Sequence, residues 1–204
     1  MSELIFNKKK HTYTVEGEVL PSVNQVLSGV GICDYSMIPE ADRDRYFTRG
    51  TYVHKAMELL LRGELDWDTV DDSILGYVRA GEKFILDTGF KMIRQEIPLY
   101  HSAYKYAGTF DAIGKIGDVA VLVDWKTGAV LDHVKYQIGG YYNLLKANNM
   151  EEPLQGYGVE LKANGKYKMS ECWNNFENGN TFLSFLATYQ RQKVRIIDGK
   201  CERV

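Results

Sequence analysis

The sequence has few cysteines and prolines, and it has no long apolar run. Only three of the 204 residues are cysteine and four are proline. Cys33, Cys172 and Cys201 stand far apart, with no pair at the spacing of metal ligands, so we expect neither a disulfide framework nor a thiolate centre such as an iron–sulfur cluster. No apolar run approaches the roughly 20 residues of a membrane-spanning helix, and the N-terminus lacks a signal-peptide pattern. We therefore expect a reduced, cytoplasmic protein with no membrane partner.

The chain also lacks an excess of charge of either sign. It has 25 Lys and Arg residues against 27 Asp and Glu residues, a formal net charge of −2. Such a balance gives no global attraction to nucleic acid, so a polyanionic ligand would need a local basic patch. The proportions of hydrophobic (45%) and charged (25%) residues are those of a soluble globular protein. Together with the length, they predict one domain over residues 1–204.

The periodicity of apolar residues predicts an α/β fold. We expect an N-terminal β-hairpin (1–21), a core (40–175) and a C-terminal helix and tail (176–204). Within the core, the pattern predicts a helix over 40–62 and a second helix, capped by the Asp66–Thr69 segment, that ends at Gly89. Strands are expected over 91–100, 104–116 and 119–125. A helix from an Asp132 N-cap to Ala147 and a hairpin around Asn164-Gly165 should follow. On the second helix, Ile74, Tyr77, Val78, Ile85 and Leu86 are expected to face inward.

The most informative stretch is an apolar strand that ends on two opposite charges. Val119–Val123 is nearly continuous apolar sequence and is followed by Asp124-Trp125-Lys126. On a strand, Asp124 and Lys126 share one face and Trp125 points to the other. A two-residue turn at Gly117-Asp118 would place Asp111 opposite Asp124, with Cβ atoms roughly 5 Å apart.

Two carboxylates this close repel each other unless a proton or a cation lies between them. Oxygen ligands favour Mg²⁺ or Mn²⁺ over zinc, so the pair indicates a divalent-metal site beside Lys126. The alternative is an ordinary surface hairpin with an Asp/Lys ion pair. That alternative predicts polar alternation, whereas the strand is apolar, as in a sheet covered on both faces.

Four motifs in order make the sequence similar to a known family. They are Arg49-Gly50-Thr51-Tyr52-Val53-His54, Gly108-Thr109-Phe110-Asp111, Asp124-Trp125-Lys126-Thr127-Gly128, and the pair Gln137 and Tyr141. Together they resemble the G-x-x-x-H, G-x-x-D, D-x-K-T-G and Q-x-x-x-Y elements of the PD-(D/E)XK nuclease superfamily, in its RecB-like, phage-type exonuclease branch. The resemblance spans roughly residues 11 to 145. It implies a restriction-endonuclease-like core, a central mixed β-sheet flanked by helices.

The resemblance also implies roles for individual residues. The implied metal ligands, for one or two Mg²⁺ or Mn²⁺ ions, are His54, Asp111, Asp124 and the backbone carbonyl of Trp125. Lys126 would act with Asp111 and Asp124 in catalysis, and Glu96 matches a further acidic position, with an exposed strand residue as the alternative. The implied substrate-binding residues are Arg49, Thr127, Gln137 and Tyr141, with core packing as the alternative for Tyr141.

The function implied is a divalent-metal-dependent DNA exonuclease that acts on single- or double-stranded ends in phage or bacterial recombination or repair. A recombination partner protein and an oligomer are compatible with that function. The alternatives are a structure-specific endonuclease with the same site and a non-catalytic nucleic-acid-binding module. In a nuclease, at least one of three basic groups should line a groove for the DNA backbone. They are Lys8–Lys10; Arg43, Arg45 and Arg49; and Lys162, Lys166 and Lys168.

Overall fold

The computed structural model describes residues 3–8, 10–33 and 39–192, and the backbone of residues 194–197 and 200–203. Its elements in chain order are β1 (Leu4–Asn7), β2 (Thr12–Val15), β3 (Glu18–Leu20), α1 (Val23–Gly29), α2 (Glu40–Arg62), a 3₁₀ turn η1 (Trp67–Thr69), α3 (Asp72–Thr88), β4 (Lys91–His101), β5 (Tyr106–Ile116), β6 (Val119–Lys126), α4 (Val134–Ala147), β7 (Gln155–Leu161), β8 (Tyr167–Met169), β9 (Trp173–Asn174), α5 (Asn175–Gln192), β10 (Val194–Ile197) and β11 (Lys200–Arg203). Lys9, part of one basic group named above, lies outside the described residues.

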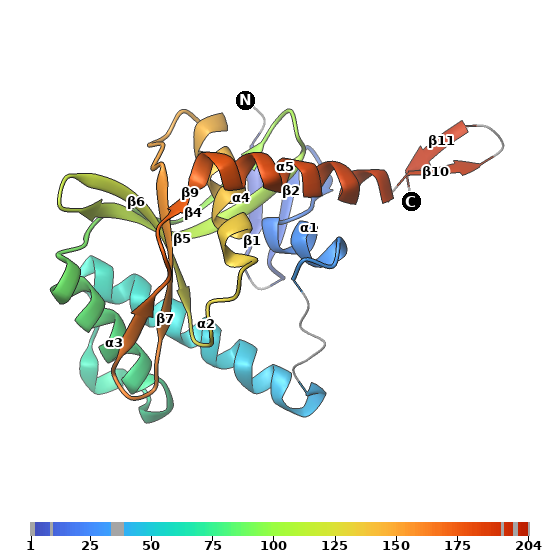
Figure 1. Cartoon of the computed structure of the whole chain (residues 1–204). Coiled ribbons are helices and arrows are strands. Elements are labelled where there is room, and N and C mark those ends of the chain that lie inside the picture. Colours follow the sequence, from blue (N-terminus) through green and yellow to red (C-terminus); the bar gives the residue numbers. More distant parts are fainter. Residues whose placement is uncertain (1–2, 9, 34–38, 193, 198–199, 204) are drawn as a thin grey trace.

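A six-stranded mixed sheet forms the centre of the protein (Figure 1). Its order is β4-β5-β6-β7-β8, and β9 also pairs with β7. Strands β4, β5 and β6 are antiparallel neighbours, whereas β6 and β7 are parallel. A parallel pair needs a crossover connection, and helix α4 provides it between β6 and β7. The expected central mixed sheet flanked by helices is confirmed in the described part of the chain.

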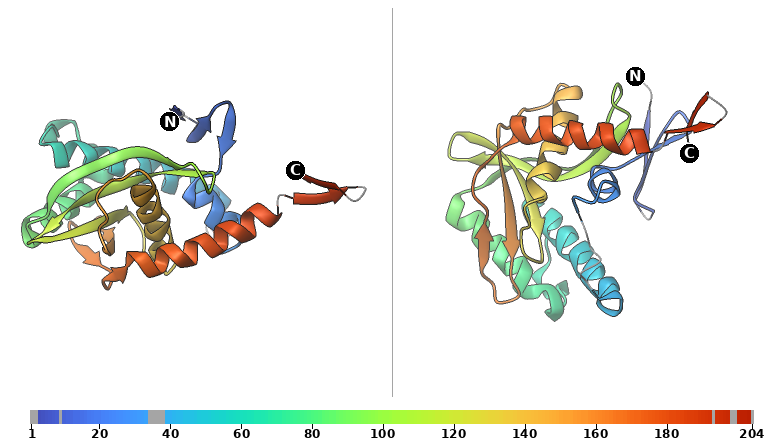
Figure 2. Two further views of the ribbon diagram at one scale, coloured as in Figure 1. Left: turned by 90° about the horizontal axis from the view of Figure 1, so that it is seen from above. Right: turned by 45° about the vertical axis from the view of Figure 1, so that its right-hand side comes forward.

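Helices cover both faces of this sheet, as the views from two directions show (Figure 2). Helices α1, α4 and α5 enclose one apolar cluster, to which β6 contributes Leu122. Helices α2 and α3 enclose the other, to which β6 contributes Val121, Val123 and Trp125. The apolar sequence of β6 is therefore explained by burial on both faces.

The N-terminal segment forms a three-stranded antiparallel sheet instead of the single hairpin expected. An additional turn separates β1 from β2: the Asn7 side chain accepts a hydrogen bond from the Lys10 backbone N–H at 3.1 Å, and His11 has a φ of 49°. Tyr13, Val15 and Leu20 pack on Ala107 of β5. The sheet is thereby fixed against the strand that carries Asp111.

Two helix starts differ from the sequence-based expectation. Asp66 caps only η1, and Asp71 accepts the capping bond from the Ser73 backbone N–H at 2.9 Å, so α3 begins later than expected. Asp132 does not cap α4, because its carboxylate accepts a hydrogen bond from Lys135 Nζ at 2.7 Å and His133 occupies the N-cap position.

On α3, the expected inward position of Leu86 is wrong. Its side chain is 75% exposed, and Phe84 is the fully buried residue of that turn. Helix α2 has the expected bounds and ends on Gly63 in the left-handed conformation, with a φ of 71°. This helix is long because one capping glycine terminates it and no proline interrupts it.

Helix α5 starts slightly earlier than expected, at Asn175, and the β10–β11 hairpin extends beyond its far end (Figure 1). Within the described residues, no helix combines the length and the apolar character needed to span a membrane.

Candidate metal centre

The predicted register of β5 and β6 is confirmed. The strands pair from Ile116 with Val119 to Ala112 with Val123 around a two-residue Gly117-Asp118 turn, in which Gly117 has a φ of 60°. Asp111 and Asp124 are the next residues along each strand. The Asp111 carboxylate (Oδ2) accepts a hydrogen bond from the Trp125 backbone N–H at 2.7 Å, so the two acids meet at the end of the hairpin ladder.

Three side chains from three elements converge here: His54 of α2, Glu96 of β4 and Asp111 of β5. One potential ligand atom from each lies within 4.8 Å of the others, and we call these three residues the metal-ligand group. His54 Nδ1 is 3.2 Å from Asp111 Oδ1. An imidazole and two carboxylates at this spacing can together coordinate a divalent ion.

The backbone of Glu96 explains how this residue joins the group. Its neighbours Gln95 and Ile97 pair with Ala112 and Phe110 of β5, which places Glu96 opposite Asp111. Glu96 itself has a φ of 51°. A non-glycine residue in this region carries strain of about 1–3 kcal/mol, and such strain is concentrated at functional sites.

Asp124 and Lys126 share one face of the sheet, as the two-residue period predicted, and this face is the one that α4 covers. Lys126 Nζ is 2.5 Å from Asp124 Oδ2 and donates a hydrogen bond to Gln137 Oε1 at 3.1 Å. Gln137 Nε2 in turn donates to the Tyr141 hydroxyl at 3.0 Å. The side chain of Trp125 lies on the opposite face, where its ring packs edge-on against Phe84.

The charges of the site are strongly coupled. Burial and the nearby Asp111 carboxylate raise the pKa of Asp124 to about 6, although Lys126 opposes this. Burial and Asp111 likewise raise the pKa of Glu96 to about 7. Burial disfavours the charged form of His54, but the Asp111 carboxylate outweighs it and raises the pKa of His54 to about 9. Burial of Asp124 and Glu96 and their repulsion by Asp111 are therefore the two costs that a cation bound at this site would offset.

The surroundings of one Asp124 oxygen show whether a metal ion fits the site. Oδ1 of Asp124 is buried and has no hydrogen-bond partner among the described residues. A buried carboxylate oxygen without a partner costs free energy, and burial raises the pKa values of Asp124 itself and of Glu96. Coordination of a divalent cation removes both penalties, so the residues present fit the Mg²⁺ or Mn²⁺ ion that the sequence implies.

Arg49 and Thr127 lie side by side at one end of the site. Arg49 Nη2 donates a hydrogen bond to the Thr127 backbone carbonyl at 3.2 Å, and the guanidinium carbon lies 4.7 Å and 5.1 Å from the ring centroids of Tyr46 and Tyr77. These contacts hold α2 against the end of β6. Gln137 and Tyr141 are each only 5% exposed, so they are better placed to position Lys126 than to contact a substrate directly.

Sequence reasoning missed the contribution of the N-terminal sheet. The Tyr13 hydroxyl hydrogen-bonds the Thr109 hydroxyl at 2.8 Å, close to Asp111 in sequence. It also missed that Glu58, one turn after His54, is buried beneath three cations. The Lys55, Glu58 and Arg62 spacing does predict ion pairs on a helix, whereas no local pattern reveals the approach of Lys8.

No protein-family model matches the chain, and no curated protein matches it in sequence. Among solved structures, the alkaline exonuclease LHK-Exo from Laribacter hongkongensis is similar at a TM-score of 0.41 and 14% sequence identity, over 84% of this chain and 88% of the exonuclease. LHK-Exo in complex with dAMP is similar at a TM-score of 0.40 and 14% identity, over 85% of this chain and 89% of that chain.

Proposed function

We propose that this protein is a divalent-metal-dependent deoxyribonuclease of the PD-(D/E)XK superfamily that hydrolyses phosphodiester bonds at DNA ends. The observation that carries the proposal is the convergence of His54, Glu96 and Asp111 next to the orphaned carboxylate oxygen of Asp124. Lys126 stands beside these acids in the Asp-x-Lys spacing of that superfamily. Recombination or repair of phage or bacterial DNA in the cytoplasm is the setting that this activity suits.

In the proposed site, His54, Asp111, Asp124, Glu96 and the Trp125 carbonyl would hold the Mg²⁺ or Mn²⁺ ions. When bound, the ion polarises a phosphoryl oxygen, lowers the pKa of water and stabilises the leaving oxygen. The Lys126 ammonium stays protonated, because Asp124 and Asp111 raise its pKa against the effect of burial. Lys126 therefore orients the attacking water and offsets the charge that develops on the phosphate.

The remaining predicted residues would position this machinery. The hydrogen bonds from Lys126 to Gln137 and from Gln137 to Tyr141 fix the ammonium in place. Arg49 keeps Thr127 and the end of β6 close to α2, and its guanidinium is a candidate for contact with a DNA phosphate.

The first experiment compares linear and circular DNA, each single- and double-stranded, with Mg²⁺, with Mn²⁺ or with EDTA. Asp124→Ala and Lys126→Ala proteins serve as site variants. Metal-dependent loss of linear DNA, absent in both variants, is expected, with circular DNA left intact. The position of an end label then gives the polarity of degradation.

Other outcomes would replace this function. Cutting of circular DNA would favour the structure-specific endonuclease. DNA binding that survives both substitutions, without cleavage of any substrate, would leave the non-catalytic binding module. Cleavage that persists in EDTA would contradict a metal-dependent site.

A further inference from the structure

A second charge cluster lies on α2 next to the metal-ligand group and is centred on a buried acid. The side chain of Glu58 is only 8% exposed. Its carboxylate is 2.8 Å from Lys55 Nζ, 2.8 Å from Arg62 Nη2 and 3.8 Å from Lys8 Nζ. Lys55 and Arg62 belong to the same helix, whereas Lys8 directly follows β1. One carboxylate thus gathers three cations from two parts of the chain.

This cluster has more positive charge than the stability of Glu58 requires. The two contacts at 2.8 Å already pair both carboxylate oxygens. Glu64 lies 4.0 Å from Arg62 Nη1, so three cations face the two acids that pair with them, and Lys8 also acts on the more distant charge of Glu96. The side chains of Lys8, Lys55 and Arg62 are 70%, 49% and 43% exposed. The buried acid therefore holds three cationic groups that remain accessible from solvent.

The cluster lies close to the metal-ligand group. Glu58 follows His54 by one helical turn and faces the same side of α2. Gln95 Nε2 donates a hydrogen bond to the Glu58 backbone carbonyl at 2.9 Å, which joins α2 to β4 directly beside Glu96. Lys8 and Glu58 both act electrostatically on Glu96. A polyanion with one phosphate at the metal-ligand group would reach these cations with a neighbouring phosphate.

We propose that Lys8, Lys55 and Arg62, anchored on Glu58, bind backbone phosphates of the DNA strand next to the bond that is cleaved. This inference rests on the proposed function. Of the three basic groups considered from the sequence, it selects the one that contains Lys8 and adds Lys55 and Arg62 of α2 to it. A flexible lysine normally loses conformational entropy when it binds a phosphate. The buried acid reduces that loss because it restrains the cations beforehand.

The test measures DNA binding and cleavage by Lys8→Gln and Lys55→Gln proteins. Both variants leave Glu58 paired with Arg62, so folding is retained. Lys83→Gln is the matched control, because Lys83 is also an exposed lysine with a carboxylate partner, Asp87, but lies on α3. The probes are a labelled 20-base-pair duplex and its single strand. Affinity is measured by fluorescence anisotropy over a salt series in EDTA, and kcat and KM are measured with Mg²⁺.

We expect each site variant to bind the probe about 3–10-fold more weakly at low salt. The slope of log affinity against log salt should become shallower by about 0.7–0.9 for each cation removed. KM should rise while kcat stays within about twofold, and Lys83→Gln should behave like the wild type.

Two results separate failure of this inference from failure of the proposed function. Wild-type cleavage together with unchanged affinity, salt slope and KM in both site variants would overturn the phosphate-binding role and leave the nuclease intact. If the wild type cleaves no DNA but Lys8→Gln binds DNA more weakly than the wild type, as expected, the phosphate-binding role would be supported and the nuclease refuted.

Discussion

At the scale of single residues, the site places acids where their charge is unfavourable until a cation binds. Asp124 has a buried oxygen without a partner, and the pKa of Glu96 is raised to about 7, first by burial and then by Asp111. In the proposed nuclease, free energy of folding would thereby be sacrificed for a centre that attracts divalent ions. Such a site should be less stable without metal than its neutral variants.

Replacement of Glu96 with Gln should stabilise the metal-free protein. The pKa of Glu96 is raised from 4.5 to about 7 in the folded protein. The folded protein therefore loses stability as the pH rises from the pKa of the unfolded chain through the pKa of the folded state. The Glu96→Gln protein should therefore have a higher free energy of unfolding than the wild type at pH 8 in EDTA, by on the order of 1 kcal/mol, and hence a higher Tm. The difference should shrink towards pH 5. Thermal unfolding followed by circular dichroism measures this.

Added Mg²⁺ should reverse the order of stability of the wild type and the Glu96→Gln protein. The wild type should gain more stability from added Mg²⁺ than Glu96→Gln, because the ligand set is then complete. Glu171→Gln, a change at an exposed position, should alter neither the stability in EDTA nor the stability gained from Mg²⁺. A Glu96→Gln protein that is less stable than the wild type at pH 8 in EDTA would show that Glu96 is a structural residue and not a strained metal ligand.

At the scale of elements, the position of Lys126 depends on how tightly α4 packs between β6 and α5. Gly139 of α4 lies against the α5 backbone: a Cβ there would come within 2.3 Å of the Asn178 carbonyl carbon. Because that neighbour is backbone, the helices must separate to accept even a methyl group. The same helix carries Gln137, which holds the Lys126 ammonium.

Gly139→Ala should therefore destabilise the protein by about 1–3 kcal/mol, measured as a shift in the urea midpoint. Gly50→Ala is a suitable comparison, since a Cβ at this helical position meets only Thr127 Oγ1 at 3.9 Å. Alanine there should stabilise α2 by about 0.5–1 kcal/mol. Equal effects of the two substitutions would contradict the packing described for α4 and α5.

The sequence predicted an element correctly where a single local feature, such as apolar periodicity or turn length, determines its structure. The apolar run of β6 and the short Gly117-Asp118 turn were sufficient to predict the register that brings Asp111 to Asp124. The Asp132 cap was wrong because a side-chain contact with Lys135 competed for the same carboxylate. The extra strand β1 was missed because the turn after Asn7 depends on a side-chain hydrogen bond and a positive φ at His11.

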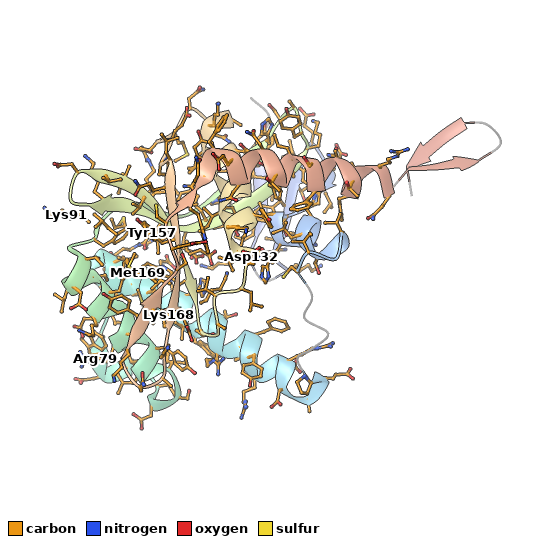
Figure 3. All side chains as sticks on the ribbon, viewed as in Figure 1. Arg79, Lys91, Asp132, Tyr157, Lys168 and Met169 are labelled. Atoms are coloured by element: carbon orange, nitrogen blue, oxygen red, sulfur yellow. The ribbon has the colours of Figure 1, made fainter. Side chains whose placement is uncertain are left out.

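At the scale of the whole molecule, the site draws on segments that are distant in sequence. His54 and Lys126 were identified from motifs, and the register followed from periodicity. The strained turn of backbone at Glu96 and the approach of Lys8 depend on packing between the N-terminal sheet, β4 and α2, so no local pattern predicts them. Figure 3 shows how densely side chains fill the layers around the central sheet, with Asp132 in the loop before α4, Arg79 on α3 and Lys168 on β8.

The charge distribution matters more than the net charge. The chain as a whole has a formal charge of −2, yet three of its cations gather around Glu58 beside the metal-ligand group. A polyanion would therefore be attracted locally, and the attraction should weaken steeply with salt.

The most direct test of the central claim is the release of nucleotides from linear DNA by the wild-type, Asp124→Asn and Asp132→Asn proteins. Asp132→Asn removes an exposed carboxylate close to the site in sequence and is the matched control. We predict release with Mg²⁺ that stops in EDTA, a loss of at least about 100-fold in Asp124→Asn, corresponding to roughly 2.7 kcal/mol of transition-state stabilisation, and activity near that of the wild type in Asp132→Asn. Undiminished release by Asp124→Asn would contradict the account.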